Sequence, residues 1–284
     1  MSEIDRFFCG GLPKSGTTFL QRALDLHPEI SCPSEHNLEY LFKLNLENLK
    51  KYNHVYLRMA TNFGIKTKEL SEKIILENFI DLISKIFENT DENKRIKGLN
   101  DNNFLLNNTQ LLLNFFESSK IILIFRNPID RACSAWRYNQ RLYEIDGNIA
   151  HIDLLKTNDE MNLELFVERQ TSIWITKFQE LKKIKDKNEE SILFLSYEDL
   201  VTKKREMLQK LLSFLKLDHS EQVISDIEKL STIDSMRNNS SSKFFYYKGD
   251  ISFGKSDLSD IFIKKMLDKA EEGIDFFNYK QYLK

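Results

Sequence analysis

A glycine-bearing loop between a short apolar run and a segment of helical period constrains this chain most. Residues 6–10 read as a buried strand, and the loop at residues 10–18 has the sequence GGLPKSGTT. Apolar residues then recur at helical spacing until His27-Pro28 ends the segment. The free N–H groups and the dipole of a helix that begins at such a loop favour a bound anion, so this layout predicts a phosphate cradle.

Two further apolar runs, at residues 120–126 and 191–196, are also each followed by a segment of helical period. This alternation is typical of parallel strands joined by crossover helices, and it predicts a P-loop-like three-layer α/β fold with a central parallel sheet flanked by helices. The 284 residues contain no internal repeat, and we interpret residues 1–284 as a single domain. We expect other helices at residues 70–87, 103–116, 160–181, 203–215 and 257–277, and loops at 143–159 and 231–242.

Composition narrows the possible partners. The formal net charge is -2, from 41 Lys and Arg against 43 Asp and Glu, so any electrostatic function has to be local and no nucleic-acid partner is expected. The three cysteines, Cys9, Cys32 and Cys133, are too few for a disulfide framework or a zinc cage, which predicts a reducing compartment and no metal site. No apolar run approaches the length of a membrane span, so we expect a soluble, cytoplasmic protein.

The loop differs from the nucleotide-binding pattern GxxxxGK[ST]. Its glycines have the correct spacing and Thr18 fits the hydroxyl position, but Thr17 stands where the lysine belongs, and the lysine lies inside the loop as Lys14. A magnesium–nucleotide enzyme would also need an acidic residue at the end of a nearby strand, whereas the run 121–125 ends in Arg126. An arginine at this place selects an anion instead of a metal.

A second motif begins at that arginine. Asn127 can cap a helix whose first residue is Pro128, which places Arg126 at the carboxyl end of a strand, where ligands bind in open α/β sheets. Arg126 and Ser134 could then hold one phosphate together, through a guanidinium fork and a single hydroxyl bond. Plainer interpretations are a tight strand-to-helix turn at the loop and a capped surface helix with a solvated arginine.

Together the two motifs resemble the PAPS-dependent sulfotransferases, which use 3′-phosphoadenosine 5′-phosphosulfate as donor. The resemblance extends through residues 24–30 and 196–200, covers residues 7–200, and continues more weakly to the C-terminus. It implies that the loop binds the 5′-phosphosulfate, that Arg126 and Ser134 bind the 3′-phosphate, and that Tyr197 lies near the adenine. The loop residues implied in donor binding are Lys14, Ser15, Gly16, Thr17 and Thr18.

The same resemblance suggests the catalytic base. Cytosolic small-molecule sulfotransferases use a histidine in a Lys-Thr-His segment, and residues 96–101 of this chain contain none. The tyrosylprotein, heparan-type and bacterial branch is similar in placing a glutamate shortly after the His-Pro that ends the first helix, and Glu35 stands there. Glu35 is therefore the expected general base, His36 is the alternative, and Lys14 would stabilise the leaving phosphate.

Two segments depart from the family pattern. Residues 100–103 have lost the lysine and proline that often precede the second phosphate motif, and Lys97 is the candidate substitute. Residues 246–255 look like a degraded form of the segment that closes over the 3′-phosphate, with Tyr247 at the arginine position and no tryptophan. Only Lys248 and Gly249 are carried over from this segment as donor-binding residues.

These patterns predict metal-independent transfer of a sulfuryl group from PAPS to an acceptor hydroxyl or amine. The alternatives are a P-loop kinase or NTPase, and a nucleotide-binding protein without catalysis. The acceptor, a carbohydrate, lipid, small metabolite or peptide, would be selected by residues 37–87, 143–159 and 231–242, which carry no motif that identifies it.

Overall fold

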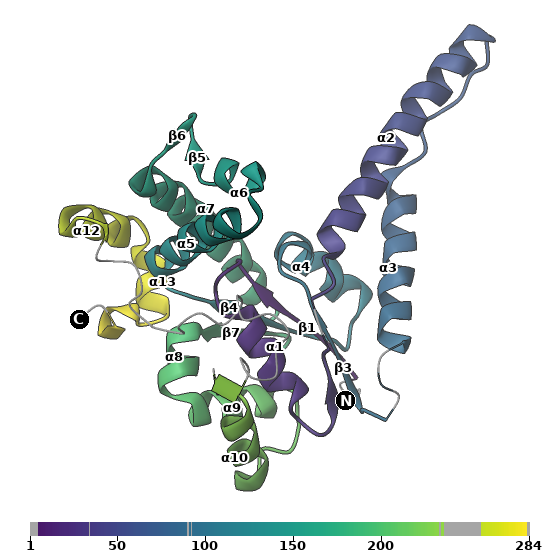
Figure 1. Ribbon diagram of the computed structural model, residues 1–284. Coiled ribbons are helices and arrows are strands. Elements are labelled where there is room, and N and C mark those ends of the chain that lie inside the picture. Colours follow the sequence, from purple (N-terminus) through teal and green to yellow (C-terminus); the bar gives the residue numbers. More distant parts are fainter. Residues whose placement is uncertain are drawn as a thin grey trace.

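A five-stranded parallel sheet with strand order β2-β3-β1-β4-β7 forms the centre of the molecule (Figure 1). The structure is a computed structural model that describes residues 5–33, 35–89, 91, 93–232, 234–235 and 257–282. The predicted central parallel sheet is confirmed. Its strands are β1 Arg6–Gly11, β2 Ile30–Ser31, β3 Ile96–Asn100, β4 Lys120–Phe125 and β7 Ile192–Ser196.

Helices cover both faces of the sheet. Successive residues of a strand point to opposite faces, so each face carries apolar side chains that a layer of helices covers. Phe8 packs in one apolar cluster, whereas Phe7 and Cys9 pack in the other. The Phe8 face is covered by α3 Glu72–Glu88, α4 Asn103–Phe115, α7 Leu163–Lys185 and α13 Glu271–Phe276. The Phe7 face is covered by α1 Thr17–Asp25, α8 Tyr197–Thr202, α9 Lys204–Phe214 and α10 Glu221–Leu230.

A third apolar cluster lies outside the two faces of the sheet. It joins α5 Pro128–Asp146, α6 Ile149–Asp153, α7 and α12 Asp260–Lys269, with Trp136 and Phe166 packed ring against ring at 5.4 Å. Two short antiparallel strands, β5 Lys156–Thr157 and β6 Glu160–Met161, lie between α6 and α7. A 3₁₀ helix at Tyr279–Tyr282 follows α13.

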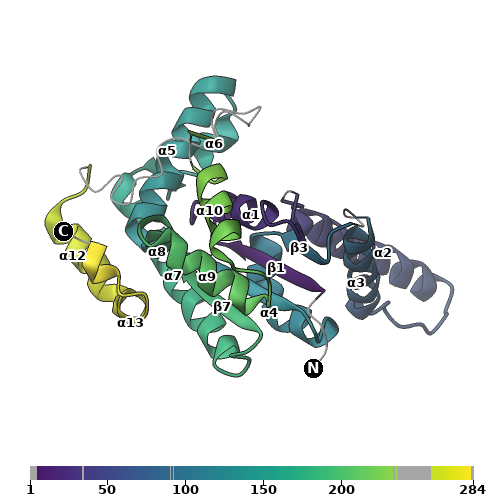
Figure 2. The ribbon, with the colours of Figure 1, turned by 90° about the horizontal axis from the view of Figure 1, so that it is seen from below.

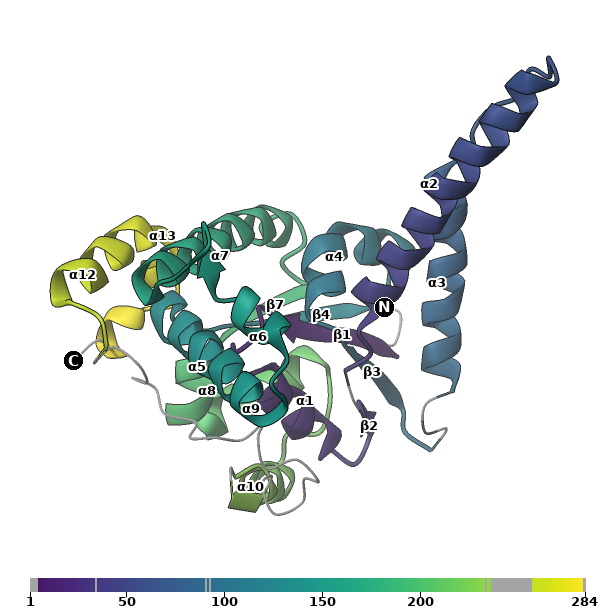
Figure 3. The same ribbon diagram turned by 45° about the horizontal axis from the view of Figure 1, so that its top comes forward.

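Two long helices project from the body as an arm, which we define as α2 Leu38–Asn62, the connection 63–71 and α3. Figures 1 and 3 show its free end standing well away from the sheet. Its base is fixed by Phe42, whose ring packs on Phe79 and Phe104 at 4.9 and 5.5 Å. The helices α12 and α13 lie at the opposite end of the molecule from the arm (Figure 2).

Several sequence expectations were wrong in detail. The expected helix at 257–277 is two helices, because the chain breaks at Ala270 and brings Gly273 against the Trp174 ring. The expected loop at 143–159 contains the end of α5, all of α6 and strand β5, while the helix expected at 160–181 begins only at Leu163. Of the expected loop 231–242, only residues 231, 232, 234 and 235 lie within the described part of the chain.

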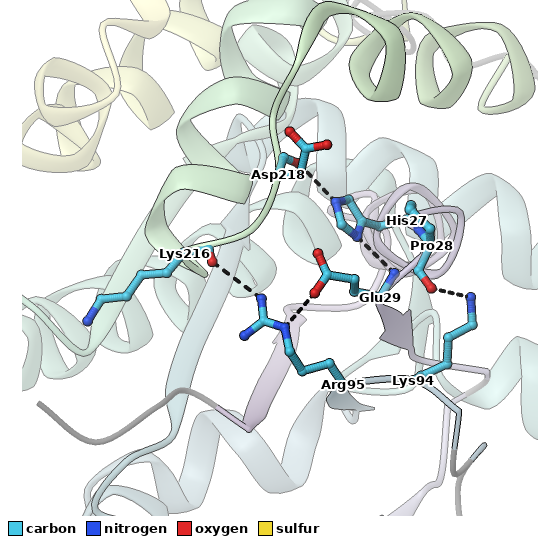
Figure 4. Close-up of polar contacts among 7 residues, drawn as sticks. All are labelled: His27, Pro28, Glu29, Lys94, Arg95, Lys216 and Asp218. Atoms are coloured by element: carbon cyan, nitrogen blue, oxygen red, sulfur yellow. Dashed lines mark hydrogen bonds and ion pairs between the residues drawn. The ribbon is translucent and has the colours of Figure 1, made fainter.

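The segment that ends α1 fastens three parts of the chain together (Figure 4). His27 Nδ1 accepts a hydrogen bond from the Glu29 amide at 3.1 Å, so its other nitrogen donates to the Asp218 carbonyl at 2.9 Å. Lys94 donates to the Pro28 carbonyl at 2.7 Å, and Arg95 pairs with Glu29. These contacts hold the end of α1 against the start of β3 and the α9–α10 connection.

A buried carboxyl ties the ends of β4 and β7 together. Glu198, which is 0% exposed, accepts the Asn127 amide on Oε1 at 3.0 Å and the Ser196 hydroxyl on Oε2 at 3.2 Å. Burial is the main influence that raises the pKa of Glu198 to about 7, and the hydrogen bond from Asn127 opposes it. The residue therefore holds the turn after β4, from which Arg126 projects.

Among the helices that the structure describes, none combines the length and apolarity needed to cross a bilayer.

The close approach of β1 and β3 gives a test of the packing. A Cβ atom added at Gly98 would lie 2.2 Å from Cζ of the fully buried Phe7 ring. We expect Gly98→Ala to lower the free energy of unfolding by about 1–3 kcal/mol, measured by urea denaturation. The cost should shrink in a Phe7→Leu background, where the ring tip is gone. An equal cost in both backgrounds would contradict the clash.

Glu198 gives a second test, of stability against pH. Because its pKa is higher in the folded protein than in the unfolded chain, its contribution to stability is complete below about pH 4.3 and is lost as the pH rises through about 7. The difference amounts to roughly 3 kcal/mol. In Glu198→Gln the amide oxygen can accept the Asn127 bond and the NH₂ group can donate to the Ser196 hydroxyl oxygen, and the loss of the titrating group should flatten this fall in urea unfolding between pH 5 and 8. Glu206→Gln, at an exposed glutamate of α9, should leave the fall unchanged.

Candidate active site

The loop between β1 and α1 has the backbone that an anion cradle requires. Lys14 and Gly16 both have a positive φ, of 72° and 93°, and the Ser15 amide donates to the Leu12 carbonyl at 3.1 Å. Within the described residues, no side chain caps α1 and its first turn contains no acidic residue. The positive end of this helix is therefore directed at the loop without a built-in counter-charge.

The loop also contains an unsatisfied hydroxyl. Ser15 is 0% exposed, and its Oγ has no hydrogen-bond partner among the residues that the structure describes. Thr17 is buried at the first position of α1, and Thr18 beside it is half-buried. An unpartnered buried hydroxyl carries a cost that a bound phosphate or sulfate oxygen would remove.

Tyr197 supports the loop from the end of β7. A Cβ atom at Gly16 would lie 2.3 Å from the Tyr197 ring, so only glycine fits this contact and this backbone. The Arg126 guanidinium lies over the same ring, 4.8 Å from its centroid. Tyr197 thus joins the two predicted phosphate motifs.

The second motif has the expected local structure. The Asn127 side chain accepts hydrogen bonds from the Ile129 and Asp130 amides at 3.0 and 3.4 Å, which confirms the predicted cap of α5. Arg126 follows β4 directly, is 7% exposed, and donates to the Lys14 carbonyl at 3.4 Å. Ser134 lies two turns along α5 and is half-buried.

Lys14 extends from the loop toward α5. Its Nζ lies 3.7 Å from the centroid of the Tyr138 ring. Burial, followed by the charges of Arg141 and Arg126, lowers the pKa of Lys14 to about 8. The Lys14 ammonium therefore lies among other positive charges, and a bound anion would reduce the repulsion between them.

A buried arginine fixes the start of the loop. Arg131, which is 2% exposed, donates to the Pro13 carbonyl at 3.3 Å and to Gln170 of α7, at 3.1 Å to its carbonyl and 2.8 Å to Oε1. Burial and the charge of Arg126 lower the pKa of Arg131 to about 10. Its contacts connect the loop to α5 and α7.

Glu35 stands across from these cations, at the carboxyl edge of the sheet. The residue forms a parallel bridge with Asn100 at the end of β3, and its Oε1 accepts a hydrogen bond from Asn102 at 2.7 Å. Partial burial and then the Asp101 carboxylate raise the pKa of Glu35, while the Asn102 bond opposes the rise. Glu35 also retains contact with solvent, where an acceptor can approach.

Tyr138 connects Glu35 to the lysine. Burial raises the pKa of the Tyr138 hydroxyl, Arg141 opposes the rise, and the Glu35 carboxylate adds to it, which places Glu35 within electrostatic reach of that ring. Sequence reasoning missed Tyr138, Arg141 and Arg131. Tyr138 and Arg141 follow Ser134 at intervals of four and seven residues, so helical spacing from that serine was the signal that could have found them.

The remaining candidates lie in different surroundings. His36 donates its amide to the Asn100 carbonyl at 3.2 Å, burial lowers its pKa, and its Nε2 is buried without a partner in the described residues. Lys97 is not in the site: it lies near the amino end of β3 and its ammonium donates to the Asp91 carbonyl. Lys248 and Gly249 fall outside the described residues.

The described residues contain no group of three or more His, Cys, Asp or Glu placed to hold a metal ion. What the site offers is a set of cations and helix amides beside a carboxylate that retains access to solvent. This arrangement can hold a polyanion through Lys14, Arg126 and the start of α1, and can accept a proton at Glu35.

The sequence is similar to that of known sulfotransferases. A family model described as "Sulfotransferase domain" matches residues 5–270. The amine sulfotransferase of Oryctolagus cuniculus is 27% identical over 121 residues, which span 42% of this chain and 37% of that protein.

Two solved structures share the fold. The mouse sulfotransferase SULT7A1, solved in complex with PAP, has a TM-score of 0.58 and 18% identity, covering 97% of this chain and 84% of its own. A sulfotransferase from Alicyclobacillus acidocaldarius has a TM-score of 0.55 and 16% identity, covering 98% of this chain and 96% of its own. With the family model matching nearly the whole length, the chain belongs to the sulfotransferase family.

Proposed function

We propose that this chain, as a single domain over residues 1–284, transfers a sulfuryl group from PAPS to an acceptor hydroxyl or amine. The observation that carries the proposal is the convergence of four cations, Lys14, Arg126, Arg131 and Arg141, where burial first and then neighbouring positive charges lower the pKa of Lys14 and of Arg131. A donor with several negative charges fits such a cluster. The unpartnered Ser15 hydroxyl in the same cradle supports the fit.

The proposed donor contacts follow the two motifs. Lys14, Ser15, Gly16, Thr17 and Thr18 would hold the 5′-phosphosulfate, with the α1 amides adding to the positive field. Arg126 and Ser134 would hold the 3′-phosphate, and Tyr197 would lie near the adenine. Lys248 and Gly249 complete the proposed set from outside the described residues.

The transfer needs one proton acceptor and one source of charge stabilisation. The bond from sulfur to the acceptor oxygen or nitrogen forms as the bond from sulfur to the phosphate oxygen breaks, and PAP is the second product. Glu35 takes the proton that the acceptor loses, and Lys14 stabilises the negative charge left on the phosphate. A glutamate in this role, with its pKa raised by burial and by Asp101, supports placement with the glutamate-base branch.

Donor binding can be tested without knowing the acceptor. We expect PAP to raise the melting temperature more than ATP with Mg²⁺ does, because β4, the strand beside the loop, is followed by Arg126 where a magnesium–nucleotide enzyme needs an acidic residue, and because Thr17 replaces the lysine of the nucleotide-binding loop. Arg126→Ala should weaken PAP binding at least about tenfold. Arg137→Ala, at an arginine of α5 that is paired with Asp257, is the matched control. A preference for Mg-ATP would overturn the proposal in favour of a phosphoryl-transfer enzyme.

The base can be tested by separating binding from turnover. Glu35→Gln should bind PAP normally but lower sulfuryl transfer to any working acceptor by about 10²–10⁴-fold. Because the acting form is the carboxylate, wild-type turnover should rise with pH through a pKa above the usual glutamate value, and this limb should vanish in the variant. Glu39→Gln, at a glutamate four residues further along the chain, should keep normal turnover and the same rise of turnover with pH. Near-normal turnover of Glu35→Gln would leave His36 as the candidate base.

A further inference from the structure

The arm presents a stripe of apolar side chains that the fold does not cover. The spacing of three and four residues places these side chains along one side of α2, and Ile65 continues the stripe into the connection. Phe63 is 71% exposed and Ile65 is 60% exposed. The arm stripe consists of Tyr52, Val55, Tyr56, Met59, Phe63 and Ile65, all of them exposed.

The stripe lies beside the side of α2 that α3 and the connection cover. Asn53 accepts a hydrogen bond from the Leu70 amide at 3.0 Å and donates to the Leu70 carbonyl at 2.9 Å. Tyr56 and Thr67 are joined through their hydroxyls at 2.9 Å. The connection is therefore fixed along α2, and the apolar stripe is a built feature of the arm.

The segment between Glu47 and Glu69 carries only positive charges, of which Lys50 is paired with Glu72 of α3 at 3.6 Å. Residues 48–68 contain no Asp or Glu, although the whole chain has a net charge of -2. Helical positions place Lys51 and Arg58 along one border of the stripe, while Lys66 and Lys68 follow Ile65. The five cations of this segment are Lys50, Lys51, Arg58, Lys66 and Lys68.

We propose that the arm docks onto an anionic lipid surface, with the stripe in the interface and the bordering cations on the headgroups. An apolar side flanked by lysine and arginine is the pattern of an interfacial helix. A second copy of the chain would bring like charges together, and a nucleic acid or acidic glycan would leave Phe63 and Ile65 in water. An anionic lipid surface would pair its headgroups with the cations and would also cover the apolar side chains.

Docking in this way has a consequence for the site. Because α2 begins at Leu38, three residues after Glu35, the arm joins the lipid surface directly to the loop that carries the candidate base. The docking itself does not depend on sulfuryl transfer, and its test uses no activity.

The test measures binding of the full chain to vesicles by co-sedimentation. Wild type should bind vesicles of phosphatidylcholine with 30% phosphatidylglycerol, bind pure phosphatidylcholine at least about tenfold less, and lose binding at high salt. Phe63→Ser with Ile65→Ser should weaken binding at least about tenfold. Lys51→Glu with Lys66→Glu should do the same, since each lysine near such a surface contributes about fivefold.

Matched controls change the same residue types elsewhere. Ile261→Ser removes an isoleucine of α12 that is more exposed than any stripe residue, and Lys183→Glu with Lys187→Glu reverses two exposed lysines near the end of α7. Both should bind vesicles like wild type, and thermal melting should show all variants folded. The proposal is overturned if wild type ignores anionic vesicles, if the controls lose binding equally, or if sedimentation shows a dimer that the stripe variants dissociate.

Discussion

Positive charges held close together at the carboxyl edge of the sheet are the constraint on which the site depends. Lys14, Arg126 and Arg131 are largely withdrawn from water, and burial, followed by the charges of neighbouring arginines, lowers the pKa values of Lys14 and Arg131. Aromatic faces and carbonyl oxygens hold them: the Tyr138 and Tyr197 rings, and the carbonyls of residues 13 and 14. Ring faces and carbonyl oxygens compensate a buried positive charge less than a carboxylate in contact does. A bound anion would therefore recover part of the free energy that is lost when these cations are buried.

The strand order makes this convergence possible. β1 lies at the centre and pairs with β4, so the loop after β1 and the turn after β4 emerge side by side. Gly11 allows the approach, since a Cβ atom there would lie 2.2 Å from the Ile124 carbonyl oxygen. β7 adds Tyr197 and Glu198 from the next position in the sheet. Three neighbouring strand ends thus contribute residues to one charged site.

Local chemistry decided which parts could be predicted from the sequence. The glycine loop, Arg126 and the Asn127 cap are each encoded within a few residues, and the structure has the predicted helices there. β3 escaped prediction because Lys97 and Gly98 interrupt its apolar pattern, and α2 because its apolar residues lie on an exposed side as well as on the buried one, so no single apolar face marks the helix. The roles of Arg131 and Glu198 arise from contacts with segments distant in the chain, which no local pattern records.

Asp101 performs two tasks at once. Its Oδ2 accepts the Leu38 amide at 2.5 Å and its Oδ1 accepts the Phe104 amide at 2.9 Å, so one carboxylate anchors the first turns of α2 and α4. The same charge raises the pKa of Glu35. Asp101 therefore both raises the pKa of Glu35 and anchors two helices. A substitution of Asp101 that changes the pKa of Glu35 would also loosen the starts of α2 and α4. Asn102 donates a hydrogen bond to the same Glu35 carboxylate at 2.7 Å and opposes the rise in its pKa, so its side chain is a second position from which that pKa is set.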